Sequence, residues 1–153
     1  LQTLTNNMVS NLYFARSEAA KRGFNVALCA NDSSQNYCPT AATSFAHGWI
    51  IFTDYDSNLA LTNSSTLFDT DGDGLLDTPE QILFIGEAPN HRFTLTSNGN
   101  PANSISYRST GQASPRSFSL IVANQDQTRK LSRIYFNTTG RVRSCMITTG
   151  EDC

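Results

Sequence analysis

The residues best suited to chemistry lie in one short acidic segment. Its carboxylates stand at positions one, three, five, nine and twelve of a twelve-residue loop: Asp69, Asp71, Asp73, Asp77 and Glu80. Gly74 takes position six, where a calcium loop of the EF-hand type makes its sharp turn. Because Ca²⁺ binds about six to eight oxygens, several carboxylates must converge on the ion, and this spacing predicts a calcium site.

The segments beside this loop do not match an EF-hand. Neither flank has the periodicity of a helix; Pro79 lies near the end of the loop, and a strand-like run over 81–87 follows. The alternative is a solvated hairpin turn, built from Asp and Gly because both residues tolerate turn geometry. Asp54 and Asp56 lie upstream, and they either add ligands or simply end a strand.

A second group of candidate residues is basic and lies near the C-terminus: Arg129, Lys130, Arg133, Arg141 and Arg143. Two strands joined by a turn at Gly140 would bring these bases together. Arg141 and Arg143 are two residues apart, so on a strand they share one face and can contact successive phosphates of double-stranded DNA without reading bases. The alternative is an ordinary solvated strand face, or contact with acidic side chains.

The net charge of −2 hides an uneven distribution along the chain. Residues 1–90 carry three bases and ten acids, a net charge of −7, whereas residues 91–153 carry eight bases and three acids, a net charge of +5. Seven of those eight bases are Arg, whose planar group pairs with phosphate or carboxylate. The asymmetry indicates either an anionic partner for the C-terminal half or acidic and basic halves that face each other in the fold.

The four cysteines form two local pairs in the sequence. Four cysteines allow three connectivities, of which the sequential one is the simplest: Cys29–Cys38 and Cys145–Cys153. Zinc binding is disfavoured because the spacing is not Cys-x-x-Cys and both histidines are isolated in the sequence. Disulfides in turn indicate an oxidising compartment, such as a periplasm or a cell surface.

The sequence argues against an enzyme and against a membrane-spanning segment. It has no Gly-x-Ser-x-Gly nucleophile motif and no glycine-rich phosphate loop before a helix. Acids crowded into one turn usually serve a cation rather than glycoside hydrolysis. No apolar run approaches the ~18 residues that a membrane helix requires. With 39% hydrophobic and only 16% charged residues, the composition is that of a globular protein with a surface rich in Ser, Thr and Asn.

The elements that must position these residues are one helix followed by strands. An apolar stripe runs through Leu1, Leu4, Met8, Leu12, Ala15 and Ala19, which predicts a helix over 1–22 that ends at Gly23. Alternation and turn residues predict strands near 25–30, 48–54, 81–87, 92–97, 104–109, 116–123, 130–137 and 141–148. Helix first and strands afterwards predict an α+β fold, with the helix laid on antiparallel sheet.

The length of 153 residues fits one domain, so we expect a single unit over 1–153, with 1–22 helical and 23–153 rich in β-structure. The chain opens at Leu1 inside the predicted helix, and we expect it to be a piece of a longer protein.

Several stretches together resemble the GspH/FimT family of minor type IV pilins and pseudopilins. In chain order they are Ala15–Gly23, Val26–Cys29, Gly48–Asp54, the acidic loop through Leu83, Ile105–Tyr107, Gly111 and Gly140–Arg141. The resemblance implies a type IV pilin fold with a long N-terminal helix, whose apolar first half is missing here. That half would anchor the full-length protein in the inner membrane, with the head in the periplasm, before the subunit joins a pilus fibre at the cell surface.

The resemblance implies a structural protein and not an enzyme. Family members prime assembly of a type IV pilus or a type II secretion pseudopilus, or sit at its tip, in contact with other minor and major pilins. FimT-like members bind DNA through a Gly-Arg-x-Arg element, which Gly140–Arg143 matches. The family often carries an Asp/Asn/Gly-rich loop without an established metal, which weakens the calcium prediction. We therefore expect a pilus subunit first, with a DNA-binding minor pilin or a secretion pseudopilin as alternatives.

Overall fold

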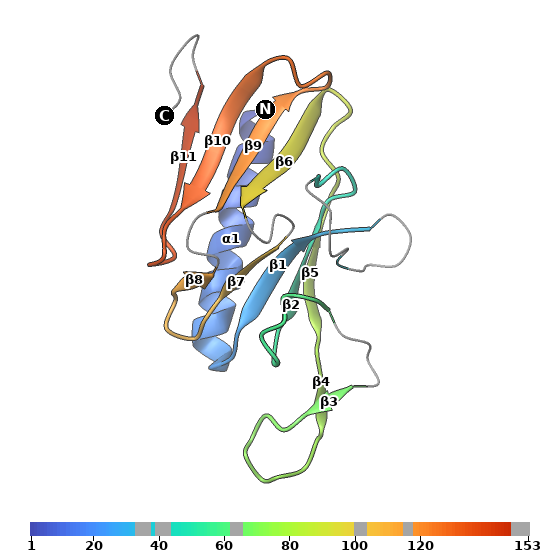
Figure 1. Cartoon of the computed structure of the whole chain (residues 1–153), viewed down its shortest axis with the longest axis vertical. Coiled ribbons are helices and arrows are strands. Elements are labelled where there is room, and N and C mark those ends of the chain that lie inside the picture. The colour runs from blue at the N-terminus through green and yellow to red at the C-terminus, as the bar shows by residue number, and fades with distance from the viewer. Residues whose placement is uncertain (33–37, 39–43, 62–65, 100–103, 115–117, 148–153) are drawn as a thin grey trace.

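The computed structural model describes residues 1–32, 38, 44–61, 66–99, 104–114 and 118–147. The long helix α1 (Gln2–Arg22) runs behind two antiparallel sheets, with its N-terminal part behind one sheet and its C-terminal part behind the other (Figure 1). A third, two-stranded sheet forms a hairpin that projects from the end of the molecule (Figure 1).

The helix ends where the sequence predicts. Gly23 adopts a left-handed conformation with φ 75°, and its N–H donates to the carbonyl oxygen of Ala19 at 3.0 Å. Glycine is favoured at this position because its lack of a Cβ permits positive φ. Lys21 and Arg22 occupy the last turn, where cations interact favourably with the C-terminal end of the helix dipole.

Sheet A has five antiparallel strands, whose bounds in spatial order are β5 (Ile82–Gly86), β2 (Trp49–Thr53), β1 (Val26–Ala30), β7 (Ser104–Tyr107) and β8 (Ala113–Ser114). Every residue of β1 and β2 is buried. One face of these strands packs toward α1, while the other forms a smaller cluster with Cys38 and the partly buried Leu59 and Leu61. Burial on both faces explains why these strands are continuously apolar.

Sheet B is built entirely from the C-terminal part of the chain. Its four antiparallel strands are, in spatial order, β11 (Val142–Met146), β10 (Lys130–Phe136), β9 (Phe118–Asn124) and β6 (Phe93–Gly99). On β10 buried and half-buried residues alternate, with Ser132, Ile134 and Phe136 turned inward. The third sheet pairs β3 (Leu67–Phe68) with β4 (Thr78–Pro79).

The main core lies between α1 and both sheets. The helix contributes Met8, Leu12, Ala15 and Ala19, all with no exposed surface. Near its N-terminal end, the buried hydroxyl groups of Thr5 and Ser132 are hydrogen-bonded at 2.9 Å, which satisfies both polar groups where α1 crosses β10. The helix therefore joins two sheets that share no strand.

These observations confirm the predicted α+β fold and all eight predicted strands, with ends that shift by up to two residues. Sequence reasoning missed three strands, β3, β4 and β8, each of two residues. Two residues are too few to show an alternation of apolar and polar side chains, so strands this short are recognised only by the strands with which they pair.

We predict that removing one side chain from the helix stripe strongly destabilises the domain. The Leu12→Ala variant should lose about 2–5 kcal/mol of unfolding free energy, because it leaves a cavity between α1 and the sheets. The control Asn7→Ala alters an exposed residue of the same helix and should stay within about 0.5 kcal/mol of the parent. Urea denaturation measures both, and equal stability of the two variants would contradict this packing.

Candidate interaction surfaces and acidic cluster

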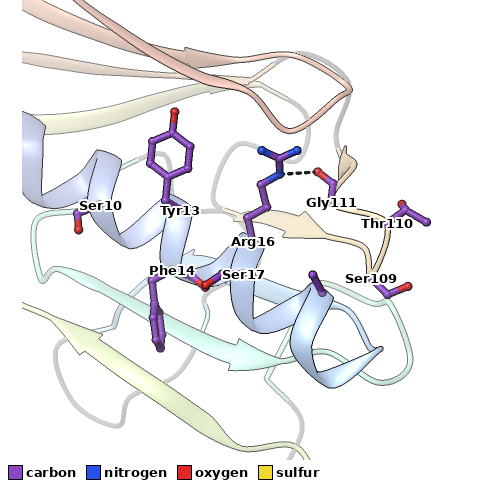
Figure 2. A pocket seen from close by; sticks show the side chains of 9 residues that line it. Ser10, Tyr13, Phe14, Arg16, Ser17, Ser109, Thr110 and Gly111 are labelled. Carbon is purple, nitrogen blue, oxygen red and sulfur yellow. Dashed lines mark hydrogen bonds between the residues drawn. The ribbon is translucent and has the colours of Figure 1, made fainter.

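One arginine of the helix contacts both sheets through their connecting loops. The Arg16 Nε donates to the carbonyl oxygen of Gly111 at 3.1 Å, in the loop between β7 and β8, as Figure 2 shows. Its Nη2 donates to the carbonyl oxygen of Thr139 at 3.2 Å, in the turn between β10 and β11. The turn between β10 and β11 also contacts β8 directly, because the N–H of Ala113 donates to the carbonyl oxygen of Thr138 at 3.0 Å.

Two glycines allow this close approach. Gly111 and Gly140 have positive φ values of 79° and 75°, a conformation that glycine adopts without the penalty of a Cβ. A Cβ on Gly140 would overlap the carbonyl oxygen of Gly111 and would lie 3.2 Å from Arg16 Nε. The turn before Arg141 is therefore fixed in place by backbone contact and by the Arg16 guanidinium.

The predicted basic residues divide into two groups on sheet B. Arg141 and Arg143 are exposed on either side of the buried Val142, so they share the outer face as the sequence predicts. On that face Arg143 pairs with Tyr135, and Arg133 pairs with Cys145, which makes Arg133 a diagonal neighbour of Arg143. We call Arg133, Tyr135, Arg141 and Arg143 the arginine face.

Arg129 and Lys130 do not belong to the arginine face. They are exposed at the opposite end of β10, at the turn that follows β9. Because a strand advances about 3.3 Å per residue, the seven residues of β10 place them roughly 20 Å from the turn at Gly140. The expectation that all five basic residues lie together is therefore wrong, because they occupy two separate positions on sheet B.

The acidic loop between β3 and β4 does not lie against the arginine face. Asp69, Asp71 and Asp73 are exposed in the loop between β3 and β4. This hairpin projects from the end of the molecule opposite sheet B (Figure 1). These three carboxylates are therefore not partners of the arginine face.

The loop between β3 and β4 satisfies its own carboxylates. Asp69 accepts hydrogen bonds from the N–H groups of Gly72 and Gly74, at 2.7 and 2.9 Å, and these bonds lower its pKa below the ordinary value. Asp71 and Asp73 likewise each accept an N–H from two residues further along the chain. Carboxylate oxygens of these three residues lie within 4.8 Å of one another. Calcium binding by this loop stays a prediction.

Glu80 lies in a different acidic cluster from the other predicted calcium ligands. Its carboxylate groups with those of Asp54 and Asp56, and the oxygens lie within 4.8 Å of one another. Asp54 has no exposed surface and Glu80 is 6% exposed, whereas Asp56 is exposed. Burial raises the pKa of Asp54 to about 7, and the charges of Glu80 and Asp56 act in the same direction.

The pairing of β2 with β5 creates this cluster. Phe52 pairs with Ile82, and the N–H of Thr53 donates to the carbonyl oxygen of Gln81 at 2.9 Å. The residue after β2 and the residue that precedes Gln81 are therefore neighbours. The sequence predicted strands at 48–54 and 81–87, but it did not show that these two strands pair. Without that pairing, the proximity of Asp54 and Glu80 could not be predicted.

Apolar side chains are exposed where the helix meets the free edge of sheet A. We call this the helix–edge surface: Phe14 of α1 and Phe84 on the helix side of β5, with Ile82 and Ile85 on the other face of that edge strand. The rings of Phe14 and Phe84 are in contact, with centroids 6.3 Å apart. β5 is an edge strand, and within the described residues no strand pairs with its outer side. An exposed apolar edge of this kind is a template for association with another chain.

Two grooves border the exposed side of α1. Tyr13 and Phe14 point to opposite sides of the helix (Figure 2). One groove is lined by both of these residues, by Arg16 and by the loop residues Thr110 and Gly111. The second groove lies between the N-terminal half of α1 and β5, and it includes Phe84 and Ile85. The exposed side of α1 is thus bordered by two surface grooves.

The cysteine prediction is confirmed for one pair. Cys29 and Cys38 form a disulfide across a separation of nine residues, within the apolar cluster on the far face of sheet A. The second predicted bridge joins Cys145 to Cys153, and Cys153 lies outside the described residues.

The fold defined by this helix and these sheets is the type IV pilin fold. Two crystal structures of the type IV minor pilin FimU from Pseudomonas aeruginosa (strain PAO1) share it, in different crystal forms. The match to one of them has a TM-score of 0.60 at 14% sequence identity, and it covers 94% of this chain and 91% of the FimU chain. The match to the other has a TM-score of 0.59 at 12% sequence identity, and it covers 99% of this chain and 90% of the FimU chain.

The chain belongs to the GspH family. The sequence profile of the family described as "Type II transport protein GspH" matches residues 4–140, and the family comprises minor pilins and pseudopilins, which are structural proteins. The match stops just before Arg141, so it does not cover Arg141 and Arg143. No curated protein matches the chain. Among the described residues, no helix is both long and apolar enough to cross a membrane.

We predict that Gly140→Ala destabilises the domain more than Gly23→Ala. Both glycines have φ 75°, so each substitution incurs the penalty of roughly 1–2 kcal/mol for a left-handed alanine. No atom lies within 4 Å of a Cβ at Gly23, whereas at Gly140 the new atom would overlap Gly111. This overlap should cost a further 1–3 kcal/mol or so, the range for overpacking. Urea denaturation gives the difference, and equal losses would show that the loops can move apart.

Proposed function

We propose that the protein is a minor pilin, which primes assembly of a type IV pilus or sits at its tip through contacts with other minor and major pilins. The observation that carries the proposal is the exposed helix–edge surface on a type IV pilin fold. Subunits of a fibre must present apolar surface that is buried only in the assembly. The proposal puts the protein in the inner membrane and periplasm before assembly and in the pilus fibre afterwards.

A type II secretion pseudopilus is the alternative host machine. The family description refers to type II transport, whereas the similar solved structures are of a pilus subunit. Deletion of the gene distinguishes the two, because loss of surface pili with normal protein secretion supports the pilus, and the reverse supports the secretion system.

We predict that Ile85→Lys blocks assembly without unfolding the head. Ile85 is 47% exposed, so a lysine there remains solvated in the free domain but would bring a buried charge into a subunit interface. The matched control Gln125→Lys adds the same charge in the exposed turn after β9. In the deletion strain, the first variant should fail to restore surface pili while the second restores them, with both proteins at parental abundance. Full piliation by Ile85→Lys would contradict the proposed surface.

We further propose that the arginine face binds double-stranded DNA. The support is local: Arg141 and Arg143 are exposed on one face, and the turn before them is fixed by Gly111 and Arg16. A backbone held in place loses less conformational freedom when the side chains on it contact phosphates. Tyr135 lies on the same face but is half-buried, so it offers little surface for stacking on bases. We therefore expect binding that depends on salt more than on sequence.

We predict that the double variant Arg141→Gln, Arg143→Gln weakens DNA binding more than Arg129→Gln, Lys130→Gln. Both variants remove two exposed positive charges, so they change the net charge equally and differ only in position. Loss of two phosphate contacts should reduce the slope of log affinity against log salt by about two. Gel retardation of a duplex at low and moderate salt measures this. Equal effects would indicate general electrostatic attraction, and absence of binding at low salt would leave the structural role alone.

A further inference from the structure

We propose that Asp54, Asp56 and Glu80 bind one Ca²⁺ ion at the base of the β3–β4 hairpin. The inference goes beyond the proposed function and does not depend on it. The three carboxylates lie at one end of the β2–β5 pair, Asp54 and Asp56 after β2 and Glu80 before β5, and their oxygens lie within 4.8 Å of one another. Oxygens that bind the same Ca²⁺ at about 2.3–2.6 Å can be no further apart than roughly 5 Å, so this arrangement fits one ion.

The strongest support is a buried oxygen without a partner. Asp54 has no exposed surface, and its Oδ1 accepts the N–H of Asn58 at 3.0 Å. Its Oδ2 is buried and has no hydrogen-bond partner in the described part of the chain. Buried polar atoms are nearly always satisfied, so an orphaned carboxylate oxygen within a group of carboxylates indicates an absent cation.

The charges around Asp54 also favour a cation. Within the described ranges, Asp54 forms no ion pair with a Lys or Arg. A buried carboxylate is unfavourable unless it is paired, and the adjacent Glu80 and Asp56 make the site more negative. A divalent cation would balance charges that the fold otherwise leaves in contact.

Backbone contacts hold the other two carboxylates in place. Glu80 Oε1 accepts the N–H of Tyr55 at 2.9 Å, and Asp56 accepts from the backbone and the side-chain amide of Asn58 at 3.1 and 2.7 Å. Ligands fixed in advance lose little freedom when they bind an ion. Since Asp56 is exposed, water can enter the site and complete the coordination that Ca²⁺ requires.

Ca²⁺ fits this site better than Mg²⁺. Three carboxylates from two chain segments offer several oxygens at irregular angles, which suits the flexible coordination of Ca²⁺. Mg²⁺ demands near-ideal octahedral geometry and usually keeps several of its waters, so one or two carboxylates generally suffice to bind it. The bound ion would tie Glu80, at the exit of the hairpin, to the end of β2.

Calorimetric titration of the chelator-treated chain with CaCl₂ tests the site. We expect one bound ion per chain and a rise in melting temperature, because a ligand of the folded state stabilises it. The Asp56→Asn substitution changes an exposed side chain, so the variant should fold normally. Its affinity for Ca²⁺ should fall by about tenfold or more, because even the loss of a group that only orients a metal ligand lowers metal affinity by that much. Asp54→Asn should abolish binding, and its circular dichroism spectrum shows whether it folds.

The loop between β3 and β4 provides the matched control. The double variant Asp71→Asn, Asp73→Asn removes two carboxylates from the exposed loop and leaves Asp54, Asp56 and Glu80 intact. Retained binding in this variant, with loss in Asp56→Asn, supports the proposal. Loss only in the loop variant would move the ion to the loop and overturn it, as would absence of Ca²⁺ binding at millimolar concentration by the parent protein.

Discussion

Two hydrogen bonds from the guanidinium of Arg16 join the helix to a connecting loop of each sheet. Sheets A and B share no strand, so nothing in their backbone ladders fixes one against the other. Apolar packing on α1 holds both sheets to the helix but is not directional, whereas the bonds from Arg16 to Gly111 and Thr139 fix the connecting loops in one position. Because the Thr139 turn leads into β11, the same bonds set the direction in which Arg141 and Arg143 project.

The fold could be predicted well from the sequence because each long element shows its own period and end signals. The helix stripe and Gly23 located α1, and the apolar runs between turn residues located every strand of four residues or more. The contact between Arg16 and the two loops could not be predicted. Its acceptors are backbone carbonyls, which every residue possesses, so no complementary side chain marks them in the sequence.

The candidate sites were harder to predict because they depend on which strands pair. Glu80 fits the spacing of a calcium loop, but β2 and β5 pair in a register that brings it to Asp54. A hairpin with its turn at Gly140 was expected to bring Arg129 and Lys130 close to Arg141. The full length of β10 separates them instead. The disulfide between Cys29 and Cys38 was predictable because its partners are local in sequence.

The free edge of β5 has a practical consequence for handling the isolated domain. An edge strand that exposes Ile82, Phe84 and Ile85 has no charged side chain among these residues to keep a second copy away. We therefore expect concentrated samples to self-associate along this edge, and dilution or a partner subunit to reduce that association. The same exposed edge would then account both for self-association in solution and for the fibre contacts proposed above.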